Sequence, residues 1–191
     1  MTGEFQPTLQ DDALLLRPLA ADDWAAVYAV ASDAEVWALH PANDRWQEAE
    51  FRRFFDEAMA SGGALAAIDR TSGAIIGSSR YEQKYCEPGE VEIGWTFLAR
   101  SHWGGATNGA MKRLMVNHAL KSFATVIFRI GEDNFRSRRA MEKIGGRLTG
   151  RRDIMEMGGR QVVHLNLCDR GAVGLGVSTP AFISPSAGSP G

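Results

Sequence analysis

The strongest constraint on the fold is a strand, a glycine-bearing turn and a helix that follow one another between residues 91 and 122. Alternation over this strand predicts one face with Val91, Ile93, Trp95 and Phe97 and another with Glu92, Gly94, Thr96 and Leu98. Gly104 and Gly105 follow, and apolar residues at helical spacing then predict a helix over residues 108–122. A strand that leads into a helix in this way indicates a sheet with helices packed on it.

The remaining segments continue this alternation of strands and helices. Further strands are predicted over residues 13–17, 64–69, 74–83, 125–130, 147–155 and 160–167. Helices are predicted to begin at Asp22 or Asp23, to span residues 46–60, and to run from Asp133 or Asn134 to Gly145. The sequence therefore predicts a mixed α/β (α+β) fold, with a central sheet of about six to seven strands and about four helices.

Composition divides the 191 residues into one domain and two ends. Residues 1–10 are predicted to be a flexible N-terminus and residues 11–168 a globular domain. Residues 169–191 are rich in Gly, Ser and Pro, so they are predicted to be a flexible tail. The apolar residues of this tail suggest a homodimer.

Several classes of function are disfavoured by composition. The formal net charge of −2 offers no general basic surface for a nucleic acid. No apolar stretch is long enough to cross a membrane, and the first ten residues do not have the pattern of a signal peptide. Cys86 and Cys168 form neither a disulfide framework nor a metal-binding spacing. We therefore expect a cytoplasmic protein without a metal, nucleic-acid or membrane partner.

The glycine turn predicts a phosphate site. The first amides of a helix lack internal partners and lie at the positive end of the helix dipole, where they bind phosphate. Glycine at 104 and 105 lets a ligand approach the backbone closely. The turn has neither the Gly-Lys-Ser/Thr of a P-loop nor the spacing of a dinucleotide fingerprint. An ordinary connection between a strand and a helix remains the alternative.

A second polar motif begins the next helix. Asn134 is followed by Ser137 and Arg139, which provide an amide, a hydroxyl and a charge at one helix end. These groups suit a ligand that lies along the helix terminus. The alternative is a capped, solvated helix in which Arg138 and Glu142 form an i, i+4 pair.

Together the motifs resemble those of the GNAT superfamily of acetyl-CoA-dependent N-acetyltransferases, most closely the branch of the Rim-type ribosomal-protein N-terminal acetyltransferases. The motifs that carry the resemblance are Glu92-Ile93-Gly94, Trp103-Gly104-Gly105, Asn134 with Ser137 and Arg139, and Lys143-Ile144-Gly145. The chain departs from the family pattern at Ala106, Asn108, Ala110 and Met141. Many members have a tyrosine acid at the place of Met141, which cannot donate a proton.

The resemblance implies acetyl-CoA as the cofactor and assigns it a set of residues. Amides of the turn would hold the pyrophosphate, namely those of Gly104, Gly105, Ala106, Thr107 and Asn108, next to Trp103. Asn134 and the backbone of Trp95, Thr96, Phe97 and Leu98 would bind the pantetheine arm. Less specific candidates for phosphate contacts are Arg100, Lys112, Arg136 and Arg139.

The reaction that the resemblance implies is direct attack of a primary amine, on a protein N-terminus or a small molecule, on the thioester. Glu92 is the predicted general base, with Glu90 in reserve, because a carboxyl group in a partly dry cleft has a raised pKa. A charge at the sheet surface is the alternative for Glu92. Ser137 is predicted to protonate the leaving thiolate, and its alternative role is helix capping.

The acceptor amine is predicted to contact Trp37, His40, Arg45 and Tyr81, for which structural packing is the alternative. Two other functions stay open. One is a catalytically weak acyl-CoA-binding or regulatory module on the same fold, which Ala106, Ala110 and Met141 favour. The other is an unrelated α/β binding protein.

Overall fold

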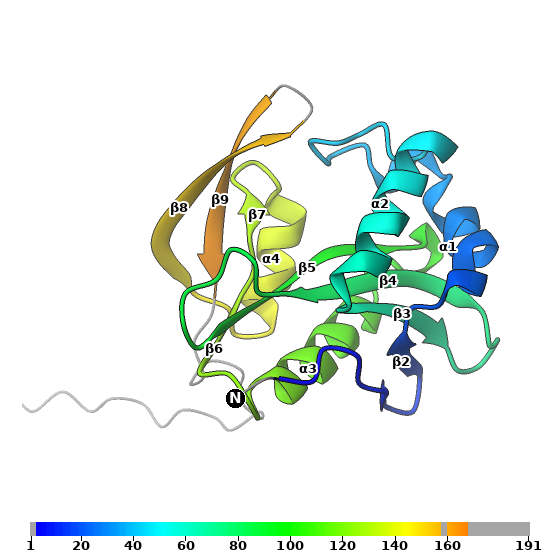
Figure 1. The fold of residues 1–191 in the computed structure, drawn as a ribbon, viewed down its shortest axis with the longest axis horizontal. Coiled ribbons are helices and arrows are strands. Elements are labelled where there is room, and N and C mark those ends of the chain that lie inside the picture. The colour runs from blue at the N-terminus through cyan, green and yellow to red at the C-terminus, as the bar shows by residue number, and fades with distance from the viewer. Residues whose placement is uncertain (1–2, 158–159, 168–191) are drawn as a thin grey trace, which may run out of the picture.

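The computed structural model describes residues 3–157 and 160–167, which form two sheets and four α-helices (Figure 1). The larger sheet contains β1 (Leu9–Gln10), β2 (Leu14–Pro18), β3 (Ala64–Asp69), β4 (Ile75–Glu82), β5 (Glu90–Leu98) and β6 (Thr125–Ile127). The smaller sheet contains β7 (Ile130–Gly131), β8 (Leu148–Met157) and β9 (Arg160–Leu167). The helices are α1 (Trp24–Ala31), α2 (Glu48–Ser61), α3 (Thr107–Ala119) and α4 (Phe135–Lys143).

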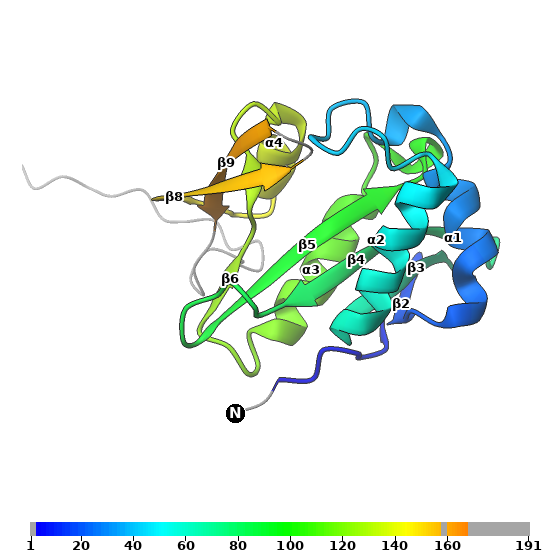
Figure 2. The same ribbon diagram turned by 45° about the horizontal axis from the view of Figure 1, so that its top comes forward.

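The larger sheet keeps the order of the sequence from β1 to β6. Its neighbouring strands are antiparallel except for β5 and β6, which pair in parallel. The smaller sheet has the order β7-β9-β8 and stands beside α4 at one end of the molecule (Figures 1 and 2). The predicted mixed α/β fold is therefore confirmed, and the last two strands, β8 and β9, pair with each other, with β7 on the other side of β9.

Each face of the larger sheet is covered by helices. α2 packs on one face with α1, through Phe51, Phe54, Phe55 and Ala58 at the spacing of an apolar helix stripe. α3 packs on the opposite face, where Met111 and Met115 join a separate core. α2 ends at Gly62, whose φ of 65° is the left-handed conformation that favours glycine at a helix end. The larger sheet therefore separates two cores, one under α1 and α2 and the other under α3.

Two predicted segments differ in the structure. The N-terminal segment, predicted to be loose, forms β1, and Phe5 stacks on Phe123 of the core. The predicted strand over residues 125–130 is broken, because β6 pairs with β5 and β7 pairs with β9. The predicted turn at residues 158–159 and the tail over residues 169–191 lie outside the described residues.

A β-bulge in β5 changes which residues share a face. Arg80 of β4 pairs with Gly94, but Ser78 pairs with Phe97, so β5 holds one extra residue there. Trp95 has a φ of 51°, the one positive φ outside glycine in the described residues. Regular alternation was therefore wrong beyond Gly94. Phe97 packs in the core under α1 and α2, whereas Ile93 packs in the core under α3.

None of the helices in the described part of the chain is both long and apolar enough to cross a membrane. Those residues also contain no group of three or more His, Cys, Asp or Glu side chains that could hold a metal ion.

Candidate active site

A cavity of about 770 Å³ lies where β5 separates from the chain that follows β6. Pairing between β5 and β6 ends at Glu92 and Ile127, after which β7 joins the smaller sheet. Figure 2 shows β6 beside the first part of β5, with α4 and the smaller sheet set apart from the rest of the strand. The cavity is lined by β5, the α3 N-terminus, α4 and the segment from Val36 to Arg45.

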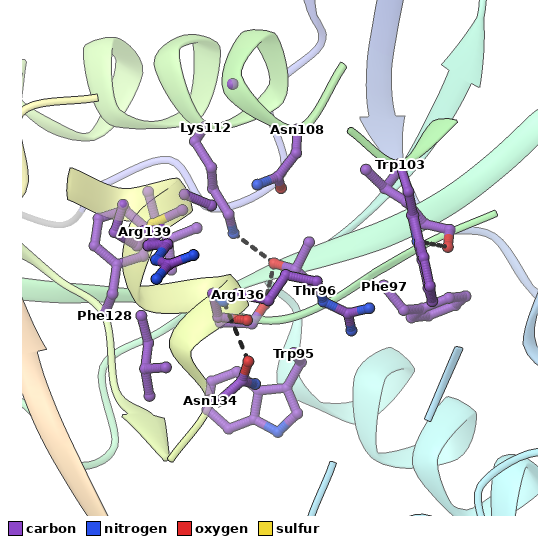
Figure 3. A pocket seen from close by; sticks show the side chains of 18 of the residues that line it. Trp95, Thr96, Phe97, Trp103, Asn108, Lys112, Phe128, Asn134, Arg136 and Arg139 are labelled. Carbon is purple, nitrogen blue, oxygen red and sulfur yellow. Dashed lines mark hydrogen bonds between the residues drawn. The ribbon is translucent and has the colours of Figure 1, made fainter. Parts of the chain in front are cut away.

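Over residues 93–98, the edge of β5 that faces the cavity has no neighbouring strand from the part of the chain that the structure describes. Unpaired backbone groups of an edge strand can bind an extended ligand as an added strand does. Trp95, Thr96, Phe97 and Leu98 all line the cavity, as predicted for the cofactor arm (Figure 3). The separation of β5 from β7 thus exposes backbone hydrogen-bonding groups to a ligand.

The N-terminus of α3 contributes a backbone surface to the same cavity. Gly104, Gly105, Ala106 and Asn108 line it, whereas Thr107 does not. Gly104 has a φ of 73°, and an added Cβ at Gly105 would meet no atom within 4 Å. Ala106 has a φ of −76°, so its side chain is accommodated without backbone strain. The N-terminus of α3 therefore borders the cavity, and helix N-termini favour anions.

Trp103 and α4 form the wall beside the turn (Figure 3). The Trp103 Nε1 donates to the Leu98 carbonyl at 2.9 Å, and the Arg136 guanidinium lies 4.3 Å from the indole centre. Arg139 also lines the cavity. Arg100 does not: its guanidinium forms a 2.5 Å ion pair with Asp33. We therefore leave Arg100 out of the phosphate site.

Asn134 and Ser137 keep the geometry that their motif predicted. The Asn134 Oδ1 accepts a hydrogen bond from the Ser137 backbone N–H at 3.1 Å, which caps α4. The Asn134 amide nitrogen and the Ser137 hydroxyl make no hydrogen bond to the described residues, and both residues line the cavity. Capping and ligand contact are therefore compatible at these positions.

Glu92 stands where β5 and β6 part, and it is 4% exposed. Its Oε2 accepts hydrogen bonds from Arg129 Nε at 2.9 Å and Nη2 at 2.5 Å. Its Oε1 accepts none from the described residues and lies beside Gly94, where an added Cβ would be 3.1 Å from it. Burial raises the pKa of Glu92, and the Arg129 charge opposes that rise. The reserve candidate, Glu90, does not line the cavity and pairs with Arg151.

Lys112 is a buried cavity residue that reaches the bulge of β5 (Figure 3). Its Nζ donates to Thr96 Oγ1 at 2.5 Å and to Ser79 Oγ at 3.2 Å. Burial lowers the pKa of Lys112 to about 7, although the charge of Glu92 opposes the change. Lys112 therefore braces the bulge from the α3 side.

The four predicted acceptor residues separate into two groups. Trp37, His40 and Arg45 line the cavity. His40 Nδ1 accepts a hydrogen bond from the Ala42 N–H at 3.0 Å, so the neutral ring carries its proton on Nε2 and cannot accept another there. Tyr81 lies elsewhere: it is 2% exposed and its hydroxyl donates to the Met115 carbonyl at 2.7 Å. Tyr81 therefore belongs to the core under α3.

The family model for the acetyltransferase (GNAT) domain matches residues 13–147, which is more than half of the chain. The chain belongs to the GNAT acetyltransferase family. Members of this family use acetyl-CoA, and an acetyltransferase requires an acceptor. No curated protein sequence gives a significant match to this GNAT protein.

Solved structures of GNAT proteins share the fold at low identity. A GCN5-related N-acetyltransferase from Brucella melitensis is 22% identical, with a TM-score of 0.74 over 85% of this chain and 77% of that one. A GNAT-family acetyltransferase from Bacillus anthracis is 22% identical, with a TM-score of 0.70 over 84% and 96%. Mycobacterium smegmatis RimJ, in complex with CoA-disulfide, is 17% identical, with a TM-score of 0.65 over 84% of each chain. At these identities the likeness shows the fold.

Two interactions of this GNAT site were missed in the sequence. Arg129 interrupts an otherwise apolar run, Val126-Ile127-Phe128 before it and Ile130 after it, and that charge was the signal of a buried partner. Arg80 lies on β4, is 5% exposed and stacks 3.8 Å from the centre of the Trp95 ring. Both arginines face groups that are distant in the sequence, so local patterns did not reveal them.

Proposed function

We propose that this protein transfers an acetyl group from acetyl-CoA to a primary amine, by direct attack of the amine on the thioester. The observation that carries the proposal is the meeting, in one cavity, of an unpaired β5 edge, the α3 N-terminal amides and the free Oε1 of Glu92. The first two suit a long anionic donor, and the third suits an amine that must lose a proton.

The residues present fit coenzyme A. Open space at Gly105 admits a pyrophosphate to the α3 amides. Side chains that bring positive charge to this part of the cavity are Arg113, Arg136, Arg139 and Lys143. The β5 edge and the Asn134 amide suit the two amides of a pantetheine arm. RimJ from Mycobacterium smegmatis, which shares the fold, is solved with CoA-disulfide. Among the primary amines considered as acceptors, a protein N-terminus is the one that a Rim-type enzyme would acetylate.

The thioester of the donor supplies the acetyl group, and the residues of the chain move the protons. Glu92 Oε1 accepts the proton that the amine must lose, directly or through a water, while Arg129 holds Oε2 in place. Because burial raises the pKa of Glu92, its carboxylate is a stronger base than an exposed one. Ser137 Oγ is the proton donor for the departing thiolate, since Met141 has no acidic proton.

The test has two measurements on the full chain. Saturating acetyl-CoA is expected to raise the melting temperature, because a ligand that binds the native state stabilises it. Thiol release from acetyl-CoA is expected on addition of at least one member of a panel of primary amines. Stabilisation without thiol release from any amine would favour the acyl-CoA-binding module instead. Absence of both would contradict the proposal.

A further inference from the structure

Two arginines that have no ion-pair partner among the described residues lie at one side of the cavity, Arg45 in its wall and Arg80 of β4 behind that wall. Arg45 lines the cavity, and its guanidinium lies 4.4 Å from the centre of the Phe54 ring and 5.6 Å from that of Trp37. Its Nη1 lies 3.5 Å from His40 Nε2, which carries the ring proton of the neutral imidazole and so accepts no hydrogen bond from it. Within the described residues no carboxylate lies within 4 Å of it, which is unusual for a cation in an aromatic wall.

Arg80 is a second such group, placed directly behind the first layer of the cavity. Its residue is 5% exposed, and its Nε has no hydrogen-bond partner. The guanidinium stacks on Trp95, which lines the cavity and is held at a φ of 51° by the bulge. Strained backbone of this kind occurs mainly where function requires it. Among the described residues Arg80 has no ion pair.

The two charges also act on each other. The pKa of Arg45 is lowered to about 10, mainly by burial and in smaller part by the positive charge of Arg80. Glu57 and Asp44 oppose this at a distance, without an ion pair to Arg45. By contrast, Arg17, Arg100 and Arg129 each have a carboxylate at 2.5–2.7 Å. A desolvated charge is costly unless it is paired, so an anion bound in the cavity beside Arg45 would lower that cost.

We infer that the acceptor is an amine that carries a carboxylate, bound by Arg45 and supported by the charge of Arg80. This inference rests on the proposed acetyl transfer and deepens it by naming the acceptor class. Trp95 and Gly94 connect the two ends of such an acceptor: Gly94 lies beside Glu92 Oε1, and Trp95 covers Arg80. The amine then faces the base, while the carboxylate faces the Arg45 guanidinium, with the charge of Arg80 behind Trp95.

The carboxylate could be the α-carboxylate of a free amino acid or the acidic side chain of the first residue of a peptide. Two matched pairs of substrates distinguish these sources. Alanine and alaninamide differ only at the α-carboxylate of a free amino acid. The amides of Asp-Ala and Asn-Ala differ only at the first side chain of a peptide. We expect kcat/KM to be at least about tenfold higher for the carboxylate member of one pair, the scale of a charge-assisted hydrogen bond. The pair that shows the preference identifies the source.

The variant Arg45→Met tests the assignment to this side chain. It is expected to lower kcat/KM about 10- to 100-fold for the carboxylate member and less than threefold for its amide. Arg52→Met is the matched control, because Arg52 also stacks on an aromatic ring, 3.3 Å from the centre of Trp24, but does not line the cavity. Melting temperatures with and without acetyl-CoA verify that each variant folds and binds the donor.

Equal kcat/KM within both wild-type pairs would overturn the inference and leave acetyl transfer intact. An equal loss for both members of a pair in Arg45→Met would also overturn it, because Arg45 would then only support the wall. Calorimetric titration with the N-acetylated forms of the same four compounds needs no turnover. Preference for an acetylated carboxylate over its amide, lost in Arg45→Met, supports the anion site even if acetyl transfer fails; no preference overturns it.

Discussion

The side of the cavity proposed to bind the donor and the side proposed to bind the acceptor are built in different ways. The donor side uses backbone groups of β5 and of the N-terminus of α3. These two segments are close in the sequence, and each contains a short motif. The acceptor side uses side chains from the segment Val36–Arg45, from β4 and from β5, brought together by the tertiary fold. Every sequence has the same backbone groups, so proteins with different sequences can bind one donor through them. In the proposed reaction, the side chains decide which amine fits. We therefore expect one side of the cavity to bind the donor and the other side to select the acceptor amine.

The largest effect is expected at the junction of the two sides. Glu92→Gln should lower kcat about 10²- to 10³-fold, because an amide cannot accept the proton of the amine. In the wild type, activity should rise with pH through the pKa of Glu92, which burial raises, and the variant should lose this limb. The measurement is the pH profile of thiol release.

Glu90→Gln is the control for that prediction. Glu90 is on the same strand but pairs with Arg151 outside the cavity, so its rate should stay within about twofold of the wild type. If Glu92→Gln kept the wild-type rate and pH profile, the base would have to be sought elsewhere in the cavity.

Gly105→Val tests whether the donor side depends on backbone access. An added Cβ meets no protein atom within 4 Å, so the melting temperature without ligand should change by no more than about 2 °C. The side chain would stand in the space assigned to the pyrophosphate, and KM for acetyl-CoA should rise roughly 10- to 100-fold. The KM for the amine should change much less. Equal rises in both KM values would contradict the separation of the two sides.

Ser137→Ala separates proton donation from helix capping. The cap of α4 uses the Ser137 backbone N–H and is retained in the variant. We expect kcat to fall about tenfold with an unchanged melting temperature, since water replaces the hydroxyl inefficiently. Steady-state kinetics with a good amine gives the answer, and an unaltered kcat would reduce Ser137 to a capping position.

Lys112→Met tests the brace beneath the bulge through stability. The pKa of Lys112 is about 7 in the folded protein, lowered by burial from 10.5, so above pH 7 the unfolded chain binds more protons. The free energy of unfolding should therefore rise with pH, by on the order of 1 kcal/mol between pH 6 and 8 from this group. Denaturant unfolding should show that the variant loses this rise. Lys121→Met, on the surface, should keep it.

The sequence by itself determined the order of the elements, the glycine turn and the cap of α4 at Asp133 or Asn134, of which the structure uses Asn134. These features depend on contacts within a few residues, so a local pattern contains them. The break between β6 and β7 was not determined in this way, since it depends on which strand each segment pairs with.

Only the tertiary structure decided the faces of β5, the partner of Glu92, the burial of Lys112 and the meeting of Arg45 with Arg80. The bulge arises from register with β4, and regular alternation along β5 alone placed Phe97 beside Ile93. Glu92 and Arg129 are 37 residues apart, so no short pattern joins them. Charges of this kind acquire their function from what surrounds them after folding, because burial and pairing set both their pKa and their need for a partner.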